Sequence, residues 1–155
     1  MGVSGCGKTT IGDLVARELG IPFVDGDSLH PPENVAKMAA GRPLTDEDRW
    51  PWLATVSAEL AKVGDGGMVL ACSALRRRYR DAIRASAPDT VFRHLHGSKE
   101  VLGQRLESRS GHFMPPALLE SQLATLEPLE ADEAGRVVDI AASVPDVVQA
   151  AVGEW

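Results

Sequence analysis

The chain has few of the residues that mark secreted, membrane or nucleic-acid-binding proteins. It has only two cysteines, Cys6 and Cys72, which we expect to be reduced thiols rather than a disulfide. It has no run of the roughly 18 apolar residues needed to cross a bilayer and no charged-then-apolar signal segment. Acidic residues outnumber basic ones by 22 to 16, and this net charge of −6 disfavours DNA or RNA as the main partner. We therefore expect a cytoplasmic protein with no membrane or nucleic-acid partner.

What the chain does contain is a phosphate-binding loop (P-loop). Residues 2–9 read GVSGCGKT, which matches the pattern G-x-x-x-x-G-K-T. The glycines let the backbone wrap around phosphate, and the N-terminus of the following helix favours negative charge. Lys8 would reach the β- and γ-phosphates, and the Thr9 hydroxyl would bind Mg²⁺. The predicted nucleotide-binding residues of this loop are Gly2, Val3, Ser4, Gly5, Cys6, Gly7, Lys8, Thr9 and Thr10.

Apolar segments alternate with helical segments along the chain, which favours an α/β fold. Strands are predicted at 21–25, 68–72, 90–95 and 137–141, and the apolar run 68–72 is typical of a strand buried on both faces. Helices are predicted from the P-loop to residue 20 and at 32–40, 45–63, 75–85, 99–109, 116–126 and 146–152. No linker divides the chain, so we expect one three-layer domain over residues 1–155, with a parallel sheet flanked by helices.

Two carboxylates follow the first predicted strand, in the order Asp25-Gly26-Asp27. Ligands of open α/β sheets bind beyond the carboxyl ends of the strands. The later apolar strand ends without an aspartate at residues 70–74, so Asp25 or Asp27 is the best acidic candidate by elimination. We expect Asp27 to be the general base and Asp25 to lie nearer the metal, although the two roles could be exchanged.

Basic residues gather in two places. Residues 76–80 read RRRYR, and on a helix Arg76 and Arg80 would share a face, although such a run also suits a solvated helix face. Arg105 and Arg109 precede a segment with glycine and proline, which favours a lid at about 109–127 closing over phosphates. The alternative for this second cluster is a solvated helix followed by a surface loop.

The four histidines show no metal-binding spacing. His94 and His96 alternate along a predicted strand, and we interpret them as structural or surface groups. His30 follows Asp27 closely and could hydrogen-bond a polyol.

With these residues together, the chain resembles the gluconate kinases (gluconokinases), a branch of the P-loop small-molecule kinases. The similarity runs over nearly the whole chain. It is carried by residues 1–9 (MGVSGCGKT), 25–31 (DGDSLHP), 34–38 (NVAKM), 41–49 (GRPLTDEDR) with 51–53 (PWL), 72–75 (CSAL) with 79–81 (YRD), 111–114 (GHFM) and 122–127 (QLATLE). The resemblance implies a nucleoside-monophosphate-kinase-like fold with a lid, and often a homodimer. It implies ATP with Mg²⁺ as cofactors and phosphorylation of D-gluconate on its 6-hydroxyl to give 6-phosphogluconate.

This substrate suits the candidate residues. Arginine recognises carboxylates through paired hydrogen bonds, and Arg49 and Arg80 are the candidates for that contact. Asp27 and His30 could bind hydroxyls, and the resemblance adds His112 to the substrate-binding set. Lys8, Arg105 and Arg109 would neutralise the transferring phosphoryl group. The predicted catalytic residues are Lys8, Asp27 and Asp25, and the predicted metal ligands are Thr9 and Asp25.

One departure from the family pattern concerns the centre of the sheet. Gluconate kinases have an apolar strand before the P-loop, and this sequence has no such run before Gly2, so we expect this first core strand to be missing. We expect the slot beside the P-loop to be empty or filled by another segment. Two alternatives stay open, namely another P-loop small-molecule kinase of the shikimate type and a catalytically impaired nucleotide-binding protein.

Overall fold

Strands and helices alternate as the sequence predicts. The computed structural model describes residues 1–107 and 116–153. The predicted lid at about 109–127 therefore falls only partly within the described residues, and Arg109 and His112 fall outside them. The elements in chain order are α1 (Lys8–Leu19), β1 (Phe23–Asp25), η1 (Gly26–Leu29), α2 (Pro32–Ala39), α3 (Asp46–Lys62), η2 (Gly64–Gly66), β2 (Val69–Ala71), α4 (Arg77–Ser86), β3 (Phe92–His96), α5 (Lys99–Glu107), α6 (Pro116–Thr125), β4 (Gly135–Asp139) and α7 (Val144–Val152); η1 and η2 are short 3-10 turns.

Local signals explain where the helices begin and end. Helix α1 ends at Gly20, whose φ of 68° is the left-handed conformation that glycine adopts without strain. Helix α3 starts with a capping box, in which the Thr45 side chain accepts from the Asp48 N–H and the Asp48 side chain accepts from the Thr45 N–H. Among the helices of the described residues, none is both long and apolar enough to cross a membrane.

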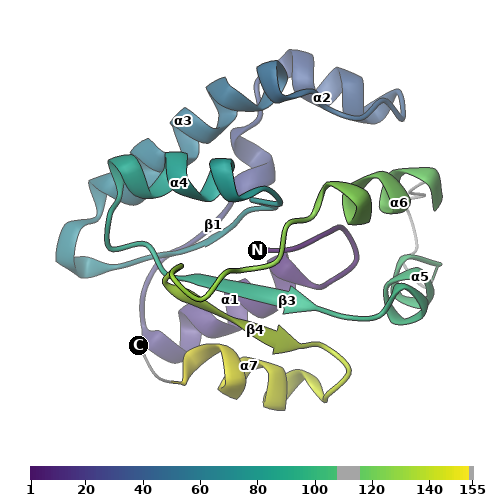
Figure 1. Ribbon diagram of the computed structural model, residues 1–155. Coiled ribbons are helices and arrows are strands. Elements are labelled where there is room, and N and C mark those ends of the chain that lie inside the picture. Colours follow the sequence, from purple (N-terminus) through teal and green to yellow (C-terminus); the bar gives the residue numbers. More distant parts are fainter. Residues whose placement is uncertain (108–115, 154–155) are drawn as a thin grey trace.

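The strands form two separate parallel pairs rather than one sheet. Strand β1 pairs with β2, and β3 pairs with β4. Figure 1 shows β3, β4 and α7 in one half of the molecule, with α3 and α4 in the other. Each half has its own apolar cluster. One centres on α1, β3, β4 and α7, and the other on α3, α4 and the end of β2.

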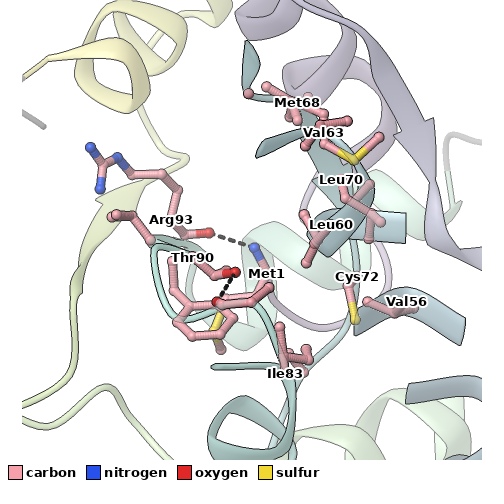
Figure 2. A pocket seen from close by; sticks show the side chains of 18 of the residues that line it. Met1, Val56, Leu60, Val63, Met68, Leu70, Cys72, Ile83, Thr90 and Arg93 are labelled. Carbon is pink, nitrogen blue, oxygen red and sulfur yellow. Dashed lines mark hydrogen bonds between the residues drawn. The ribbon is translucent and has the colours of Figure 1, made fainter. Parts of the chain in front are cut away.

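A slot separates β2 from β3, as expected from the departure at the centre of the sheet. Met1 and Gly2 lie across the end of the slot next to the P-loop. The Met1 α-amino group donates to the Arg93 carbonyl of β3 at 2.5 Å, and the Gly2 N–H donates to the Ser73 carbonyl just after β2 at 3.2 Å. The rest of the slot is a cavity of about 410 Å³ (Figure 2). Because Leu70 borders it, this strand residue is only half-buried, which corrects the prediction that the run 68–72 is buried on both faces.

Candidate functional site

The P-loop forms a tight backbone turn at the start of α1. Gly5 has a φ of 83°, and a Cβ at this position would lie 2.8 Å from Leu106 Cγ, so both backbone conformation and space require glycine. Gly7 has a φ of 91° and forms the cap from which α1 begins at Lys8. The Lys8 ammonium lies across the loop and donates to the Val3 carbonyl at 2.9 Å. The loop thus combines a helix N-terminus with a cation, the pairing that favours bound phosphate.

The two candidate carboxylates lie at the end of β1, next to the P-loop helix. Asp25 accepts a hydrogen bond from the Thr9 hydroxyl at 2.7 Å and another from the Asp27 N–H at 3.0 Å. Between them, a Cβ on Gly26 would lie 2.5 Å from the Ala71 carbonyl, so only glycine lets this turn pack on the end of β2. The structure therefore brings Thr9, Asp25 and Asp27 together, as the sequence predicts.

A magnesium ion suits this group of atoms. A hydroxyl and a carboxylate supply the hard oxygen ligands that Mg²⁺ prefers, and Mg²⁺ usually binds through one or two carboxylates with substrate phosphates and water. Thr9 Oγ1 and Asp25 Oδ2 already lie within hydrogen-bonding distance of each other. Within the described residues there is no cluster of three or more acidic, histidine or cysteine side chains that would hold a metal by itself. Ligands from phosphate and water would therefore complete the site.

His30 is held rigidly beside Asp27. Its ring stacks on Trp52 with centroids 4.2 Å apart, and Asn34 donates to its Nδ1 at 3.2 Å. Burial lowers the pKa of His30, the nearby Asp27 carboxylate raises it and the Arg49 guanidinium lowers it. Because Nδ1 accepts from the Asn34 amide, the neutral ring carries its proton on Nε2, which is then a donor for a hydroxyl oxygen.

A polar pocket of about 230 Å³ lies where α3, α4 and α6 approach one another. Arg49 and Arg76 line it together with Tyr79 and Asp46. The Arg49 guanidinium lies 5.6 Å above the Tyr79 ring, and its Nε donates to the Leu44 carbonyl at 3.3 Å. Arg76 Nε is buried without a hydrogen-bond partner among the described residues. Two guanidinium groups at one pocket favour an anionic ligand such as a carboxylate.

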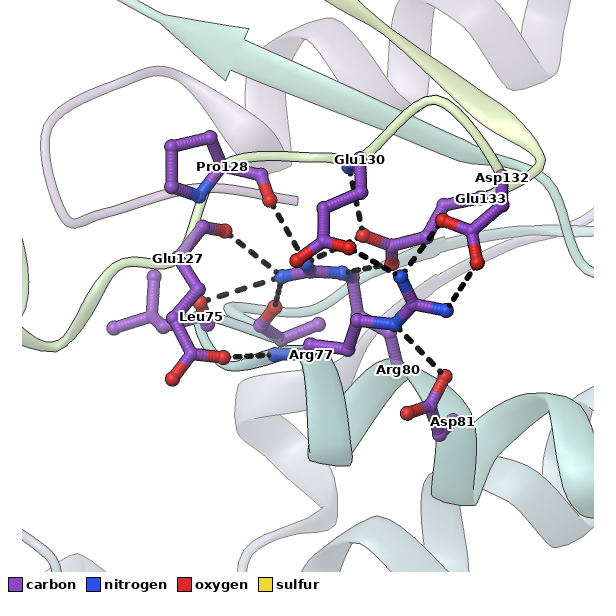
Figure 3. Close-up of polar contacts among 10 residues, drawn as sticks. Leu75, Arg77, Arg80, Asp81, Glu127, Pro128, Glu130, Asp132 and Glu133 are labelled. Carbon is purple, nitrogen blue, oxygen red and sulfur yellow. Dashed lines mark hydrogen bonds and ion pairs between the residues drawn. The ribbon is translucent and has the colours of Figure 1, made fainter.

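Arg80 does not lie in this pocket, which corrects its prediction as a carboxylate ligand. It is fully buried, and its Nε and Nη2 donate to Glu133 at 2.5 Å and 2.8 Å. Its remaining donors bind the carbonyls of Ala74, Leu75, Glu127 and Pro128 (Figure 3). All three guanidinium nitrogens of Arg80 therefore donate hydrogen bonds, and these bonds connect the segment after α6 with the start of α4.

Arg77 serves the same purpose at the surface. It forms ion pairs with Glu130 and Asp132 at 2.7 Å, and these neighbours raise its pKa further (Figure 3). Arg78 donates to Asp46 at the start of α3. Acidic partners thus neutralise much of the run 76–80, which is not an exposed basic surface.

Two arginines beyond the loop, Arg105 and Arg109, are also predicted to contact phosphate, and only Arg105 lies within the described residues. Arg105 of α5 donates to the Ile140 carbonyl at 2.6 Å. A Cβ built on Gly7 would lie 3.6 Å from Arg105 Nη1, so this guanidinium lies next to the P-loop as predicted.

Sequence reasoning missed three contributors to the site. The sequence predicts Arg76 on the same helical face as Arg80, but α4 begins at Arg77 and leaves Arg76 in an extended cap conformation. Trp52 donates to the Gly26 carbonyl at 2.7 Å and supports His30. Gln122 of α6 accepts from the Ser4 N–H of the P-loop at 2.7 Å. The run PWL at 51–53 and the run QLATLE at 122–127 carried a signal for the last two, because both belong to the family resemblance.

Comparison with known proteins identifies the family. The family model for shikimate kinase matches residues 4–149. A gluconokinase from Gluconobacter oxydans (strain 621H) is 53% identical over 130 residues, which are 82% of this chain and 72% of the relative. The thermosensitive gluconokinase of Escherichia coli (strain K12) is 46% identical over 153 residues, which are 96% of this chain and 81% of the relative. The chain belongs to the gluconokinase family.

The structural comparison agrees with this family. A crystal structure of a gluconokinase from Sinorhizobium meliloti 1021 superposes with a TM-score of 0.91 at 49% identity, covering 98% of this chain and 86% of that one. The APS kinase CysC of Mycobacterium tuberculosis has a TM-score of 0.66 at 19% identity, which shows a shared fold alone. The gluconokinase fold predicted from the sequence is thus confirmed.

Proposed function

We propose that the protein transfers the γ-phosphate of ATP to the 6-hydroxyl of D-gluconate, giving 6-phosphogluconate and ADP. The observation that carries this proposal is the pocket containing Arg49 and Arg76, because Arg49 lies near enough to His30 to lower its pKa and Asp27 near enough to raise it. A sugar acid offers a carboxylate for the arginines at one end and a chain of hydroxyls toward the phosphate loop. The gluconokinase relatives support the same acceptor.

The nucleotide side of the site positions the phosphates and offsets their charge. The N–H groups at the start of α1 and the Lys8 ammonium would hold the β- and γ-phosphates. Thr9 and Asp25 would hold Mg²⁺, which when bound neutralises phosphate charge. Arg105 would add positive charge beside Gly7, and we keep Arg109 in the same role.

Transfer itself needs a positioned hydroxyl and a proton acceptor. Asp27 would accept the proton of the 6-hydroxyl while the hydroxyl oxygen forms a bond to the γ-phosphorus. The bond between that phosphorus and the oxygen bridging to the β-phosphate breaks, and the electron pair leaves with ADP. The Nε2–H of His30 would donate to a hydroxyl of the acceptor and hold its chain beside Asp27.

Recognition of the carboxylate would fall to Arg49 and Arg76. Arg76 replaces Arg80 in this role because Arg80 has all its donors engaged inside the protein. The buried Arg76 Nε without a partner among the described residues is a donor that a bound carboxylate could satisfy. We keep His112 as a further candidate on the acceptor side, together with a homodimeric state and a cytoplasmic location.

A turnover assay with a panel of acceptors tests this proposal. ATP and Mg²⁺ are combined with D-gluconate, with shikimate, with glucitol, which has no carboxylate, or with no acceptor, and ADP release is followed. We expect turnover with D-gluconate and at least about tenfold less with glucitol, since one lost charged hydrogen bond costs ~1.5–3 kcal/mol. Turnover of shikimate but not of gluconate would show that gluconate is not the acceptor. Nucleotide binding without any phosphorylated product would favour a catalytically impaired protein.

A further inference from the structure

The polar pocket between α3, α4 and α6 contains a negative charge that the proposed function does not use. Asp46, the first residue of α3, lines this pocket together with Arg49 and Arg76. A carboxylate repels any other anion that comes close to it. The groups that surround Asp46 therefore decide which anions the pocket can hold.

Both carboxylate oxygens of Asp46 are engaged. Oδ1 accepts a hydrogen bond from the Tyr79 hydroxyl, and Oδ2 accepts one from the Arg78 guanidinium. Oδ2 also lies 3.9 Å from Arg76 Nη1, and the Asp46 side chain is only 24% exposed. Because both oxygens are held, the carboxylate cannot easily turn away when a second anion enters the pocket.

Asp46 also positions the two arginines that line the pocket. Since Nη1 of Arg76 faces Asp46, the buried Nε, which has no partner among the described residues, remains for a ligand. The Tyr79 ring, whose hydroxyl donates to Asp46, lies under the Arg49 guanidinium at 5.6 Å and beside that of Arg78 at 5.8 Å. The same carboxylate thus orients Arg76 directly and Arg49 through the tyrosine ring.

The charges around the pocket balance a single negative charge. Arg49, Arg76 and Arg78 bring three positive charges to this group. Asp46 offsets one of them, and Glu47, an exposed residue of the pocket lining, offsets a second. Among the described residues, one positive charge remains in excess. A carboxylate neutralises it, whereas a phosphate group, with about −1.5 to −2 at pH 7, would place surplus negative charge beside Asp46.

We propose that Asp46 is a specificity-determining residue, which makes the pocket accept the carboxylate of a sugar acid and reject the phosphate of a sugar phosphate. This proposal rests on the proposed function, because it takes the pocket as the site of the acceptor carboxylate. A repulsive group aimed at the wrong ligand is a common source of specificity. Phosphorylated polyols of similar length would then compete poorly with the sugar acid.

Calorimetric titration with two ligands tests the proposal. D-gluconate is compared with D-glucitol 1-phosphate, which carries a phosphate group where gluconate carries its carboxylate. We expect the chain to bind gluconate at least about 20-fold more tightly, and Asp46→Asn to lower this ratio by about tenfold, because a like-charge contact is removed. A second neutral variant, Asp46→Ser, which also suits a helix start, should lower it equally. Glu47→Gln, the matched control with the same charge change at an exposed position, should lower it less than about threefold.

Tyr79→Phe separates charge from positioning. It removes the hydrogen bond to Asp46 and keeps the negative charge. We expect both ligands to bind about fivefold more weakly, the cost of one hydrogen bond, with their ratio within about twofold of that of the parent chain. Thermal unfolding of each variant shows that it is folded.

The outcomes distinguish this proposal from the proposed function. An unchanged ratio in the folded Asp46 variants would overturn the role of Asp46. An equal fall in Glu47→Gln would assign the selection to net charge, and a similar fall in Tyr79→Phe would assign it to positioning. Gluconate binding with the expected ratios but no turnover would contradict the kinase activity and leave the selection by Asp46 intact. Binding of neither ligand would remove the carboxylate site and the role of Asp46 with it.

Discussion

The proposed nucleotide side and the proposed acceptor side of the site are built in different ways. The nucleotide side comes from one continuous loop, residues 2–9, and its partner Asp25, and it uses backbone N–H groups and glycine conformations. The acceptor side gathers His30, Arg49 and Arg76 from three separate segments that tertiary packing brings together. A sequence motif is therefore enough to predict the nucleotide side, whereas the arginines of the acceptor side depend on how the helices pack.

Replacing Arg80 should lower the stability of the fold that holds the acceptor side together. Replacing Arg80 by alanine leaves the buried Glu133 carboxylate unpaired, and breaking a buried ion pair typically costs ~3–5 kcal/mol. Their side chains are only 1% and 5% exposed. We expect the free energy of unfolding in urea to fall by about that amount. Arg84→Ala on the same helix, where the guanidinium donates to the Pro88 carbonyl, should cost less than ~1 kcal/mol. Equal losses would contradict the structural role of Arg80.

Lys8→Ala should damage the nucleotide side most. It removes the cation that we propose faces the β- and γ-phosphates, and losing one such electrostatic contact lowers kcat by about 10²–10³-fold. The expected stability change is small, because Lys8 makes a single hydrogen bond to Val3 within the loop besides its sulfur contact. Steady-state kinetics with gluconate checks this, with Lys62→Ala at the end of α3 as the control. A kcat within threefold of the parent chain would exclude the role.

Asp27→Asn tests the residue proposed to act where the nucleotide side and the acceptor side meet. If Asp27 accepts the hydroxyl proton, kcat should fall by about 10²-fold while the affinity for ATP stays within a factor of about two. Asp65→Asn in η2 is a matched exposed control. An unchanged kcat would remove Asp27 from the proton-transfer step and leave Asp25 as the remaining acidic candidate.

Arg76→Ala should act on acceptor binding alone. Losing a charged hydrogen bond of ~1.5–3 kcal/mol raises the KM for gluconate by about 10–100-fold. Arg49→Ala should show the same split, with kcat less affected than KM. Arg17→Ala, an exposed residue paired with Asp13, is the control. If Arg76→Ala lowers stability and leaves KM unchanged, Arg76 belongs to the scaffold with Arg80 and Arg77.

The smallest expected effect is a dependence of stability on pH at the slot. The Met1 α-amino group has a pKa of about 6 in the folded chain and 8.0 as its ordinary value. The unfolded chain therefore binds more protons between these values, and the free energy of unfolding should rise by ~2 kcal/mol from pH 6 to pH 8. His94, whose pKa burial lowers to about 4, also adds to this slope, mainly below about pH 7, because its imidazole in the unfolded chain is still half protonated at its ordinary pKa of 6.5. Acetylating Met1 should therefore remove most of the rise above about pH 7, and a rise that persists there would assign it to other groups.

Much of the fold could be predicted because its signals are local. The capping box at Thr45, the stop at Gly20 and the period of each helix depend on neighbouring residues. The P-loop and its contact with Asp25 were also predictable, since motif and strand end define them. The role of Arg80 was not, because it depends on Glu133 and on the carbonyls of Glu127 and Pro128, which only folding brings near. The sequence does not predict the position of Arg76, because α4 begins at Arg77 rather than at the predicted residue 75. One helical position turns a side chain by about 100°.

The most direct test of the central claim is the identity of the product. The protein is incubated with ATP, Mg²⁺ and D-gluconate, and the products are resolved by ³¹P and ¹³C NMR. We predict one phosphate monoester on C6 for each ADP formed. ADP with inorganic phosphate, an ester on another carbon, or no reaction would contradict the account.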